Sequence, residues 1–395
     1  SAVDEQVRLG VVGVGAQGRM YAKLVASGRA PSLTLAALCS ANPQSTSRRS
    51  HQQLAAEMGV PLFTDLSQLL RSGEVEAVVI TTPHYQHPQM GIEALQSGVN
   101  VLLEKPAGVY TKQVRELLRV ADQRRDLTLA MMFNQRANPL YADLKQAIDA
   151  CTYGALRHTI WQITHWWRPD AYYTSSPWRA SWGGEGGGVL VNQAPHQLDL
   201  WQWLCGMVTR CFARVQFGYR RDIPVDDEVN ALVEFAGGAS GTFMTCTNDL
   251  VGTDRLELLF DRAKVVVDDS ATITTWHFVD DERAIARAVS PADAALVPSG
   301  AFDRSQFYSV DTRTYSSPWG EQHALVLDNF GLNILEGTPL IAPGRQGIDS
   351  VRLANAMHLS AWTGADIEMA SFDEDRYLAE LNARIAAEGR YPLRS

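Results

Sequence analysis

The sequence predicts an α/β protein in which a doubly wound parallel sheet is followed by an α+β domain built on a largely antiparallel sheet. Up to about residue 135, short apolar runs alternate with helical patterns, as consecutive βαβ units require. Beyond that point the pattern changes to a series of strand-like runs, which is typical of an antiparallel sheet. For a chain of 395 residues we therefore expect two domains, residues 1–134 and residues 135–395.

In the first domain, each strand is expected where a mostly apolar run ends in a loop. A strand over residues 7–12 leads into a glycine-rich turn and then into a helix through Met20, Leu24 and Val25. The other expected strands are 33–38, 77–81, 100–103 and 128–133. The helices expected between them are 52–58, 90–96 and 113–123.

In the second domain, the strand-like runs are followed by two helical patterns near the C-terminus. The expected strands are 159–164, 210–217, 230–235, 241–247, 255–260 and 264–267. The expected helices, 323–337 and 347–363, are joined through Pro339 and Pro343.

The composition excludes several classes of protein. With 46% hydrophobic and 20% charged residues, the chain is expected to be globular rather than disordered. Its 35 basic and 44 acidic residues give a net charge of −9 without a long basic run, which argues against nucleic acid or an anionic membrane as a partner. No segment approaches the roughly 18 unbroken apolar residues of a membrane span. A small molecule is the expected ligand.

The five cysteines predict neither disulfides nor a metal site, because they are widely spread and contain no CxxC pair. A reducing cytoplasm fits this pattern best. Residues 1–10 carry charge where a signal peptide would have its apolar core, although a signal removed earlier would leave no trace. We expect a cytoplasmic protein on these grounds.

The turn after the first strand carries a nucleotide-binding pattern. Gly13, Gly15 and Gly18 form G-x-G-x-x-G, with Ala16 and Gln17 between them, after a strand and at the start of a helix. Backbone N–H groups and the positive end of the helix can hold a pyrophosphate there. A tight turn without a ligand is the alternative. The surrounding βαβ pattern favours dinucleotide binding in a Rossmann domain.

The sequence after the second strand favours NADP over NAD. An NAD site places an Asp or Glu about 20 residues after the glycines, yet no acidic residue occurs between Glu5 and Glu57. Ser40 stands where that acid would be, so a 2′-phosphate would meet a hydroxyl. We expect Ser40, Asn42 and the basic Arg48 to bind NADP(H), and NAD(H) stays open. Arg48 could equally lie on a solvated helix face.

Two further loops follow buried strands, and the carboxyl edge of such a sheet is where ligands bind. Lys105, at a strand end ahead of Pro106, is expected to point into the cofactor crevice, although a surface lysine is the alternative. The cofactor-binding residues expected around this edge are Thr82, Pro83, His84, His87, Glu104, Lys105, Asn134, Trp178 and Arg179.

A glycine-rich segment precedes a second group of polar residues. Five glycines surround Glu185 and permit close approach of a ligand to the backbone. Asn192 and His196 are four residues apart and share a helix face. Residues 165–182 are rich in Trp and Tyr, whose rings suit the C–H faces of sugars but equally suit a core or a dimer interface. The expected substrate-binding residues are Lys105, Arg168, Tyr172, Trp178, Asn192 and His196.

Together these motifs resemble the glucose-fructose oxidoreductase, inositol dehydrogenase and rhizopine-catabolism family, Gfo/Idh/MocA. The glycine loop, Glu-Lys-Pro at 104–106, Trp-Arg at 178–179, the glycines before His196 and Pro-Leu-Ile-Ala-Pro-Gly at 339–344 occur in the family's order. The resemblance implies a pyridine-nucleotide oxidoreductase of sugars or cyclitols, with a Rossmann domain and a sheet domain that often forms oligomer contacts. We expect a homo-oligomer, a dimer or tetramer.

The resemblance also implies catalytic roles. The family commonly places a Lys, an Asp and a His at the site, and Lys105 and His196 match two of these positions. Asn192 stands where the Asp would be, which removes a negative charge, and it could equally be a helix N-cap. Asp199 is more often a cap or a surface acid than a partner of His196. We predict His196 as the acid/base group, Lys105 as the stabiliser of the alkoxide, and Asn192 beside them.

Two other functions fit the same residues. A glycosidase could oxidise C3 transiently, eliminate the aglycone and add water before the hydride returns. A nucleotide-bound regulator without turnover could share the architecture. The presence of both Lys105 and His196 counts against the regulator.

Overall fold

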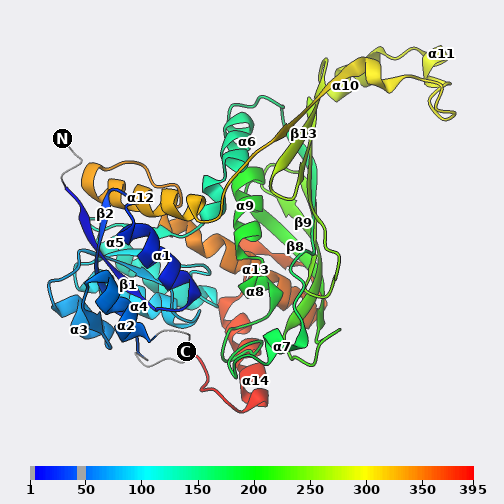
Figure 1. The fold of residues 1–395 in the computed structure, drawn as a ribbon. Coiled ribbons are helices and arrows are strands. Elements are labelled where there is room, and N and C mark those ends of the chain that lie inside the picture. The colour runs from blue at the N-terminus through cyan, green and yellow to red at the C-terminus, as the bar shows by residue number, and fades with distance from the viewer. Residues whose placement is uncertain (1–4, 42–49) are drawn as a thin grey trace.

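Two β-sheets with helices between them organise the chain, as Figure 1 shows for the computed structural model. The structure describes residues 5–41 and 50–395. The first sheet has the strand order β3-β2-β1-β4-β5-β6, and its neighbouring strands are parallel. The elements of this part are β1 Val7–Val12, α1 Ala16–Ala26, β2 Leu33–Cys39, α2 His51–Met58, β3 Leu62–Phe63, α3 Leu66–Arg71, β4 Ala77–Ile80, α4 Gln86–Gln96, β5 Asn100–Leu103, α5 Thr111–Gln123 and β6 Leu129–Met131. The predicted doubly wound parallel sheet is confirmed.

The central strands of this sheet position the loops that follow them. All residues of β4 and β5 are buried, as expected for parallel strands covered by helices on both faces. The strand ends are tied together, because the N–H of Gly13 donates to the carbonyl of Cys39 at 2.9 Å and Thr81 Oγ1 donates to the carbonyl of Gly13 at 2.8 Å. The glycine loop and the loop after β4 therefore meet at one edge of the sheet.

The second sheet has nine strands in the order β14-β13-β12-β11-β7-β10-β9-β8-β15. Strands β7 and β10 pair in parallel, and the other neighbours are antiparallel, which confirms the predicted largely antiparallel sheet. Its strands are β7 Leu156–Ile163, β8 Val208–Phe217, β9 Asp226–Phe235, β10 Ser240–Cys246, β11 Asp254–Phe260, β12 Ala263–Asp268, β13 Thr272–Phe278, β14 Tyr308–Thr314 and β15 Ile367–Glu368. The helices of this part are η2 Asn134–Ala137, α6 Pro139–Asp149, α7 Asp170–Tyr173, α8 Val189–Asn192, α9 Pro195–Cys205, α10 Glu282–Ala288, α11 Pro291–Ala294, η3 Arg304–Phe307, α12 Glu321–Glu336, η4 Gly344–Gln346, α13 Gly347–Thr363, η5 Met369–Ser371 and α14 Glu374–Glu388.

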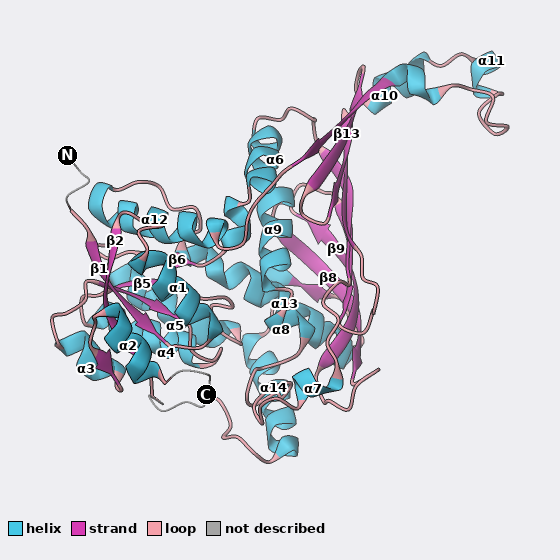
Figure 2. Ribbon diagram, in the orientation of Figure 1, coloured by secondary structure: helices cyan, strands magenta, loops and turns pink. Residues whose placement is uncertain are grey.

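Helices cover one face of the nine-stranded sheet, the face toward the first sheet (Figure 2). Trp201 of α9 is fully buried in the core between helix and sheet, against Phe235 and Phe243 of the strands. Its indole N–H donates to Thr159 Oγ1 at 3.1 Å, so the one polar atom of the ring is satisfied. The opposite face exposes apolar side chains, including Ile160 and Leu232.

Helix α12 returns to the first sheet, although it follows the second sheet in the sequence. Phe330 and Leu327 of this helix are buried in the same cluster as Leu9 and Leu33 of β1 and β2. Asp328 accepts the N–H of Ser32 at 2.8 Å. The residues after 134 are thus not confined to the second sheet, because α12 completes the core of the first.

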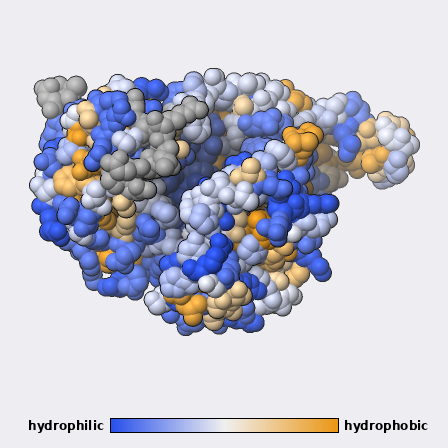
Figure 3. Space-filling model, turned by 60° about the horizontal axis from the view of Figure 1, so that its bottom comes forward, coloured by the Kyte–Doolittle hydropathy of each residue, from blue (hydrophilic) through white to orange (hydrophobic). Residues whose placement is uncertain are grey.

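Strands β13 and β14 continue into an arm, residues 279–307, that projects from the body (Figures 1 and 3). Its helices α10 and α11 contain no buried residue. Six of the seven residues of β14 are exposed, and its sequence has no apolar alternation. The sequence analysis predicted no element here, because a strand that buries neither face carries no hydrophobic period.

We expect α12 to stabilise the first sheet. Phe330→Ala should lower the free energy of unfolding by about 3 to 5 kcal/mol, because a fully buried ring is replaced by a cavity. Urea denaturation followed by tryptophan fluorescence measures this. Leu325→Ala is the matched control, since Leu325 lies on the same helix but is 48% exposed, and it should change stability by less than about 0.5 kcal/mol. Equal losses in both variants would contradict the assignment of α12 to this core.

Candidate active site

The glycine loop has the geometry of a pyrophosphate cradle. Gly13 has φ +93, which favours glycine, and a Cβ on Gly18 would lie 1.9 Å from the carbonyl oxygen of Gly13. A Cβ on Gly15, in contrast, would meet nothing within 4 Å. Helix α1 begins at Ala16 with no side-chain cap and no acidic residue in its first turn. The loop therefore offers unobstructed backbone and a positive helix end, which fit a dinucleotide.

The residue expected to meet the ribose end of a nucleotide is partly engaged. Ser40 is only 6% exposed, and its Oγ lies 2.5 Å from Nδ1 of His51. Burial and the nearby Arg19 lower the pKa of His51. Asn42 and Arg48 lie outside the described residues, so their expected contacts stay predictions.

The loops after β4 and β5 are fastened to each other by a buried histidine. His87 Nδ1 lies 2.7 Å from the carbonyl oxygen of Pro106, and its Nε2 lies 2.5 Å from that of Thr82. The ring is 1% exposed, so it shapes the crevice from behind, and neither of its nitrogens is left for a ligand. Thr82 Oγ1 turns to Met90, whereas Pro83 is exposed.

Glu104 and Asn134, both expected near the cofactor, are buried and hydrogen-bonded to protein. The hydroxyl of Tyr21 in α1 donates to the Glu104 carboxylate, which links the first helix to β5. Burial raises the pKa of Glu104, while Tyr21 and Lys105 act in the opposite direction. Asn134 Nδ2 donates to Gln322 Oε1 at 3.0 Å. These two side chains support the crevice.

Lys105 reaches across to the second part of the chain. Its Nζ donates to the main-chain carbonyl of Asn192 at 2.5 Å. Burial lowers the pKa of Lys105, whereas the carboxylates of Glu104 and then Glu185 raise it, and Arg168 lowers it further. The ammonium group is therefore withdrawn from water and held in a field of two carboxylates.

Asn192 ends α8 and does not cap the next helix, whose N-cap is Ala194. The cap alternative was wrong, because the side chain turns the other way. Its Nδ2 donates to Tyr172 Oη at 2.8 Å and to Glu185 Oε2 at 3.0 Å. Asn192 thus contributes its main-chain carbonyl to Lys105 and its amide to a carboxylate.

His196 lies in the first turn of α9, which begins at Pro195. Its Nδ1 is buried without a hydrogen-bond partner among the described residues. Burial, and then the charges of Lys105 and His323, lower the pKa of His196 well below its usual value. His323 of α12 is itself buried, which lowers its pKa to about 4. The imidazole of His196 is therefore neutral at physiological pH and can accept a proton.

The hydroxyl of Tyr172 receives three donors. Arg179 Nη1, Asn192 Nδ2 and Gln193 Nε2 lie 2.7, 2.8 and 3.1 Å from Tyr172 Oη. With these groups donating to its oxygen, the phenolic hydrogen is free to point elsewhere. The Arg179 guanidinium also lies over the rings of Tyr172 and Trp178, with its Cζ 4.3 and 4.7 Å from their centroids. The Cζ of Arg168 also lies over the Tyr172 ring, 5.1 Å from its centroid.

Glu185, which the sequence analysis did not assign to the site, lies at its centre. Its carboxylate accepts the N–H of Ala180 at 2.7 Å and the amide of Asn192 at 3.0 Å, and it pairs with Arg179 at 3.6 Å. Its main-chain carbonyl lies 3.0 Å from His84 Nδ1. Burial lowers the pKa of His84 to about 3, so this histidine is neutral. A lone acid among glycines was the signal that could have identified Glu185.

Two further anchors hold the glycine-rich segment. Asp226 of β9 accepts the N–H groups of Gly188 and Leu190, each at 2.8 Å, and lies 2.8 Å from His358 Nε2 of α13. Burial raises the pKa of Asp226, but the stronger combined effect of His358 and the two N–H donors lowers it overall. The carboxylate of Glu388, at the end of α14, accepts the N–H groups of Trp182 and Gly183.

Asp199 is neither a cap nor a surface acid, contrary to expectation. It is buried in α9 and forms a two-bond ion pair with Arg136 of η2, at 2.9 and 2.7 Å. Pairing both charges inside the protein avoids leaving either one buried alone. This pair fixes α9, and with it His196, to the end of the first sheet.

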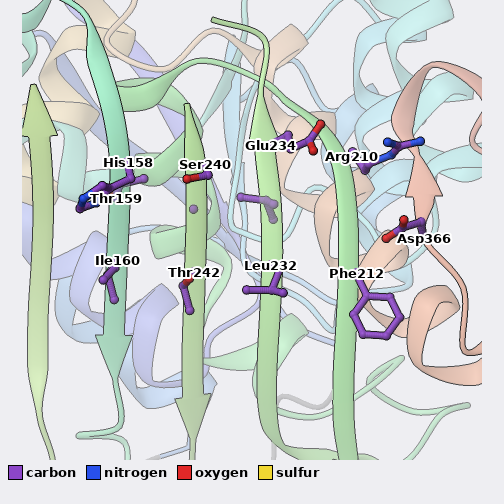
Figure 4. A pocket seen from close by; sticks show the side chains of 12 residues that line it. His158, Thr159, Ile160, Arg210, Phe212, Leu232, Glu234, Ser240, Thr242 and Asp366 are labelled. Carbon is purple, nitrogen blue, oxygen red and sulfur yellow. The ribbon is translucent and has the colours of Figure 1, made fainter. Parts of the chain in front are cut away.

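The structure thus joins Lys105, Asn192, Tyr172, Arg179, Glu185 and His84 through direct contacts or charge interactions. The hollow in Figure 4 lies elsewhere, on the open face of the nine-stranded sheet, and contains none of the expected site residues. In residues 5–41 and 50–395, no cluster of three His, Cys, Asp or Glu is placed to hold a metal. No helix of those residues is long and apolar enough to span a membrane.

Both parts of the chain match known protein families. The oxidoreductase family with an NAD-binding Rossmann fold matches residues 7–132, and the GFO/IDH/MocA C-terminal domain matches residues 141–266. The chain is 27% identical over 237 residues to the rhizopine catabolism protein MocA of Rhizobium meliloti, covering 59% of this chain and 69% of that protein. It is 27% identical over 265 residues to inositol 2-dehydrogenase 1 of Saccharopolyspora erythraea, covering 64% and 71%.

Solved structures share the whole architecture. The WlbA dehydrogenase from Bordetella pertussis, in complex with NADH and UDP-GlcNAcA, superposes with a TM-score of 0.72 at 25% identity, over 92% of this chain and 99% of that one. Levoglucosan dehydrogenase, in complex with NADH and L-sorbose, gives a TM-score of 0.77 at 18% identity over 92% and 99%, which shows a common fold.

We expect Gly15→Ala to weaken nucleotide binding without weakening the fold. The added Cβ meets no protein atom within 4 Å but would stand where the backbone must approach a pyrophosphate. Calorimetric titration should show at least about a tenfold loss of dinucleotide affinity, or about 1.4 kcal/mol, with an unchanged melting temperature. Gly18→Ala is the contrasting variant, because its Cβ collides with Gly13 and should lower the melting temperature as well. Wild-type affinity in Gly15→Ala would contradict the cradle.

Proposed function

Because the chain belongs to the Gfo/Idh/MocA family of oxidoreductases, we propose that it transfers a hydride between a nicotinamide dinucleotide and a ring hydroxyl of a sugar, glycoside or cyclitol. The observation that carries this proposal is the position of Lys105, whose Nζ donates to the main-chain carbonyl of Asn192, four residues before His196. A buried ammonium group and a neutral imidazole interact at the carboxyl edge of a Rossmann sheet. Oxidation of an alcohol needs both a positive charge for the developing alkoxide and a base for its proton.

In the oxidation direction, the substrate hydroxyl loses a proton and its carbon loses a hydride. Nicotinamide, when bound, supplies the hydride acceptor. His196 takes the proton, since its lowered pKa keeps it neutral. Lys105 donates a hydrogen bond to the same oxygen and stabilises its growing negative charge. Asn192 holds Lys105 in place through its main-chain carbonyl. Reduction reverses these roles.

The side chains around Tyr172 support a polyhydroxylated substrate. Its phenolic hydrogen can donate to a substrate oxygen, because the three side chains within hydrogen-bond distance of its oxygen are all donors. Trp178 is 37% exposed beside it and can lie against the C–H face of a ring. Arg168 adds a positive charge near Lys105, which suits an anionic substituent.

We infer that NADP(H) is the preferred cofactor, with NAD(H) as the alternative. Gly13, Gly15, Ala16, Gln17 and Gly18 would hold the pyrophosphate. No acid occurs between Glu5 and Glu57 to repel a 2′-phosphate or to accept from a ribose hydroxyl.

We further propose a homo-oligomer that uses the open face of the nine-stranded sheet. Figure 4 shows Ile160, Thr242, Leu232 and Phe212 projecting from four adjacent strands along a hollow of about 620 Å³. Leu232 is 59% exposed, and apolar side chains in such a row favour contact with a second protein surface.

The proposal predicts that NADP⁺ or NAD⁺ is reduced when the protein is given a suitable free sugar, cyclitol or glycoside. Absorbance at 340 nm measures the reduced cofactor, and release of a chromogenic aglycone is read in parallel. Steady growth at 340 nm supports the dehydrogenase and identifies the nucleotide. Aglycone release without a rise in absorbance at 340 nm would replace the proposal with the oxidoreductive glycosidase. Neither aglycone release nor reduced cofactor would favour the regulator without turnover.

His196→Ala should lower kcat by about 10² to 10⁴ while nucleotide affinity stays within about twofold, because the base acts only on the substrate proton. In the wild type, the acid limb of kcat/KM for oxidation should lie below pH 6.5, since burial and Lys105 lower the pKa of His196 and the base form persists at lower pH. Stopped-flow and steady-state pH profiles measure both. His277→Ala, far out on β13, is the control. An unchanged kcat in His196→Ala would remove this residue from the mechanism.

A further inference from the structure

The site contains a buried carboxylate, that of Glu185, beside the amide of Asn192. Asn192 stands where an Asp is common in the family, so one carboxylate is absent from that position. The Oε2 of Glu185 lies 3.0 Å from Asn192 Nδ2, so a carboxylate is nevertheless present on the neighbouring segment. Glu185 is 4% exposed and cannot be explained as a surface charge.

We propose that Glu185 is the positioning residue that supplies this missing charge. Its carboxylate orients the amide of Asn192 and favours the ammonium form of Lys105 while the substrate oxygen becomes negative. This inference rests on the proposed function for its catalytic meaning, because a dehydrogenase needs Lys105 charged during oxidation.

The backbone around Glu185 is built to hold its carboxylate in one place. The N–H of Ala180, a residue with φ +53, donates to Oε1 at 2.7 Å. The N–H of Glu185 itself donates to the carbonyl of Ser181 at 3.1 Å. A Cβ on Gly186 would lie 2.2 Å from Val109, so the loop packs tightly against the segment after β5. The cost of burying the carboxylate is offset by these contacts rather than by water.

The charges that face Glu185 come from four segments. Arg179 lies 3.6 Å away in the preceding loop, and Lys105 approaches from the end of β5. Asp226 of β9 repels it, and neutral His84, after β4, meets only its main-chain carbonyl. Burial raises the pKa of Glu185, while Ala180, Arg179 and Lys105 oppose that effect. Two cations and one anion therefore surround the carboxylate, and the cations limit the rise that burial imposes on its pKa.

The attraction between Glu185 and Lys105 acts in both directions. Glu185 raises the pKa of Lys105 against the larger effect of burial, as Glu104 also does. Glu104 accepts the hydroxyl of Tyr21 and lies on the same strand end as Lys105, so it cannot orient Asn192. Glu185 alone of these two carboxylates contacts both the catalytic amide and Arg179. Removal of its charge should therefore free the amine of Lys105 and loosen Asn192 together.

The first test reads the charge state of Lys105 without substrate or nucleotide. In reductive methylation at pH 8, the free amine of a lysine attacks formaldehyde and cyanoborohydride reduces the resulting imine, and peptide mass spectrometry gives the rate at each lysine. In Glu185→Gln, Lys105 should be methylated at least about threefold faster than in the wild type. Loss of the nearby negative charge lowers the pKa of Lys105, so more of it is present as the free amine. Lys23 and Lys112, both exposed, serve as internal references. An unchanged rate at Lys105 would overturn the proposal.

A matched control uses another acid and lysine pair. Glu257 Oε1 lies 3.1 Å from Lys264 Nζ on the open part of the second sheet. Glu257→Gln removes a carboxylate that is paired with another lysine, so it should leave Lys105 at the wild-type rate. Faster labelling of Lys105 in this control would mean that the effect reflects general loosening, which would also overturn the proposal.

The second test moves the charge between the two positions. Glu185→Gln should lower kcat by about 10-fold to 100-fold, and the double variant Glu185→Gln with Asn192→Asp should recover most of that loss, since a carboxylate again faces an amide. Asn192→Asp alone should lower both kcat and the melting temperature, because two carboxylates would then face each other. Asn192→Asp would thus lower kcat in the wild type but raise kcat in the Glu185→Gln variant. Simple addition of the two losses would overturn the proposal.

The methylation and kinetic experiments distinguish failure of the Glu185 role from failure of the proposed function. If the wild type reduces no nucleotide with any substrate, the proposed function fails, while faster methylation of Lys105 in Glu185→Gln still supports the charge role. If Glu185→Gln does not fold, Asn192→Asp decides the question, because an unchanged melting temperature and kcat there would show that no carboxylate faces position 192.

Discussion

The hydrogen bond from Lys105 Nζ to the main-chain carbonyl of Asn192, 2.5 Å long, connects the two halves of this active site. Lys105 is fixed by the first sheet and Asn192 by the segment before α9, so the bond forms only when both parts are in register. Breaking it would leave a buried ammonium group without a hydrogen-bond acceptor, which costs several kcal/mol. Two other contacts hold the segment that contains Asn192 near Lys105. Asp226 accepts the N–H of Gly188, and Arg136 pairs with Asp199.

The burial that disfavours the charged form of Lys105 also keeps His196 neutral and able to accept a proton. Exclusion of water lowers the pKa of both groups, since each becomes harder to charge. Carboxylates oppose this effect for Lys105 without overcoming it, whereas for His196 the neighbouring charges are positive and add to it. The candidate site therefore contains a lysine whose charge two carboxylates support and a histidine that is neutral. This separation is what an acid/base pair at neutral pH requires.

The sequence predicted the backbone of the site better than its electrostatics. Glycine spacing and apolar runs identified the cradle and the sheet edge, because a left-handed turn and a buried strand each restrict the residue types allowed. Glu185 and the Arg136 to Asp199 pair escaped, since their roles depend on contacts between segments far apart in the chain. The spacing to His196 identified Asn192, but it did not predict where the Asn192 side chain points, because Ala194 rather than Asn192 caps α9. The arm escaped because it buries neither face.

The glycines around Glu185 now have a physical reason. A side chain at Gly184 or Gly188 would lie within 2.3 Å of backbone oxygens, and one at Gly186 would strike Val109. The segment can pack closely against Trp178, Val109 and Asp226 only because it lacks Cβ atoms at these glycines, and this packing holds its one carboxylate beside Asn192. The position of this carboxylate therefore depends on the surrounding glycines as much as on the acid itself.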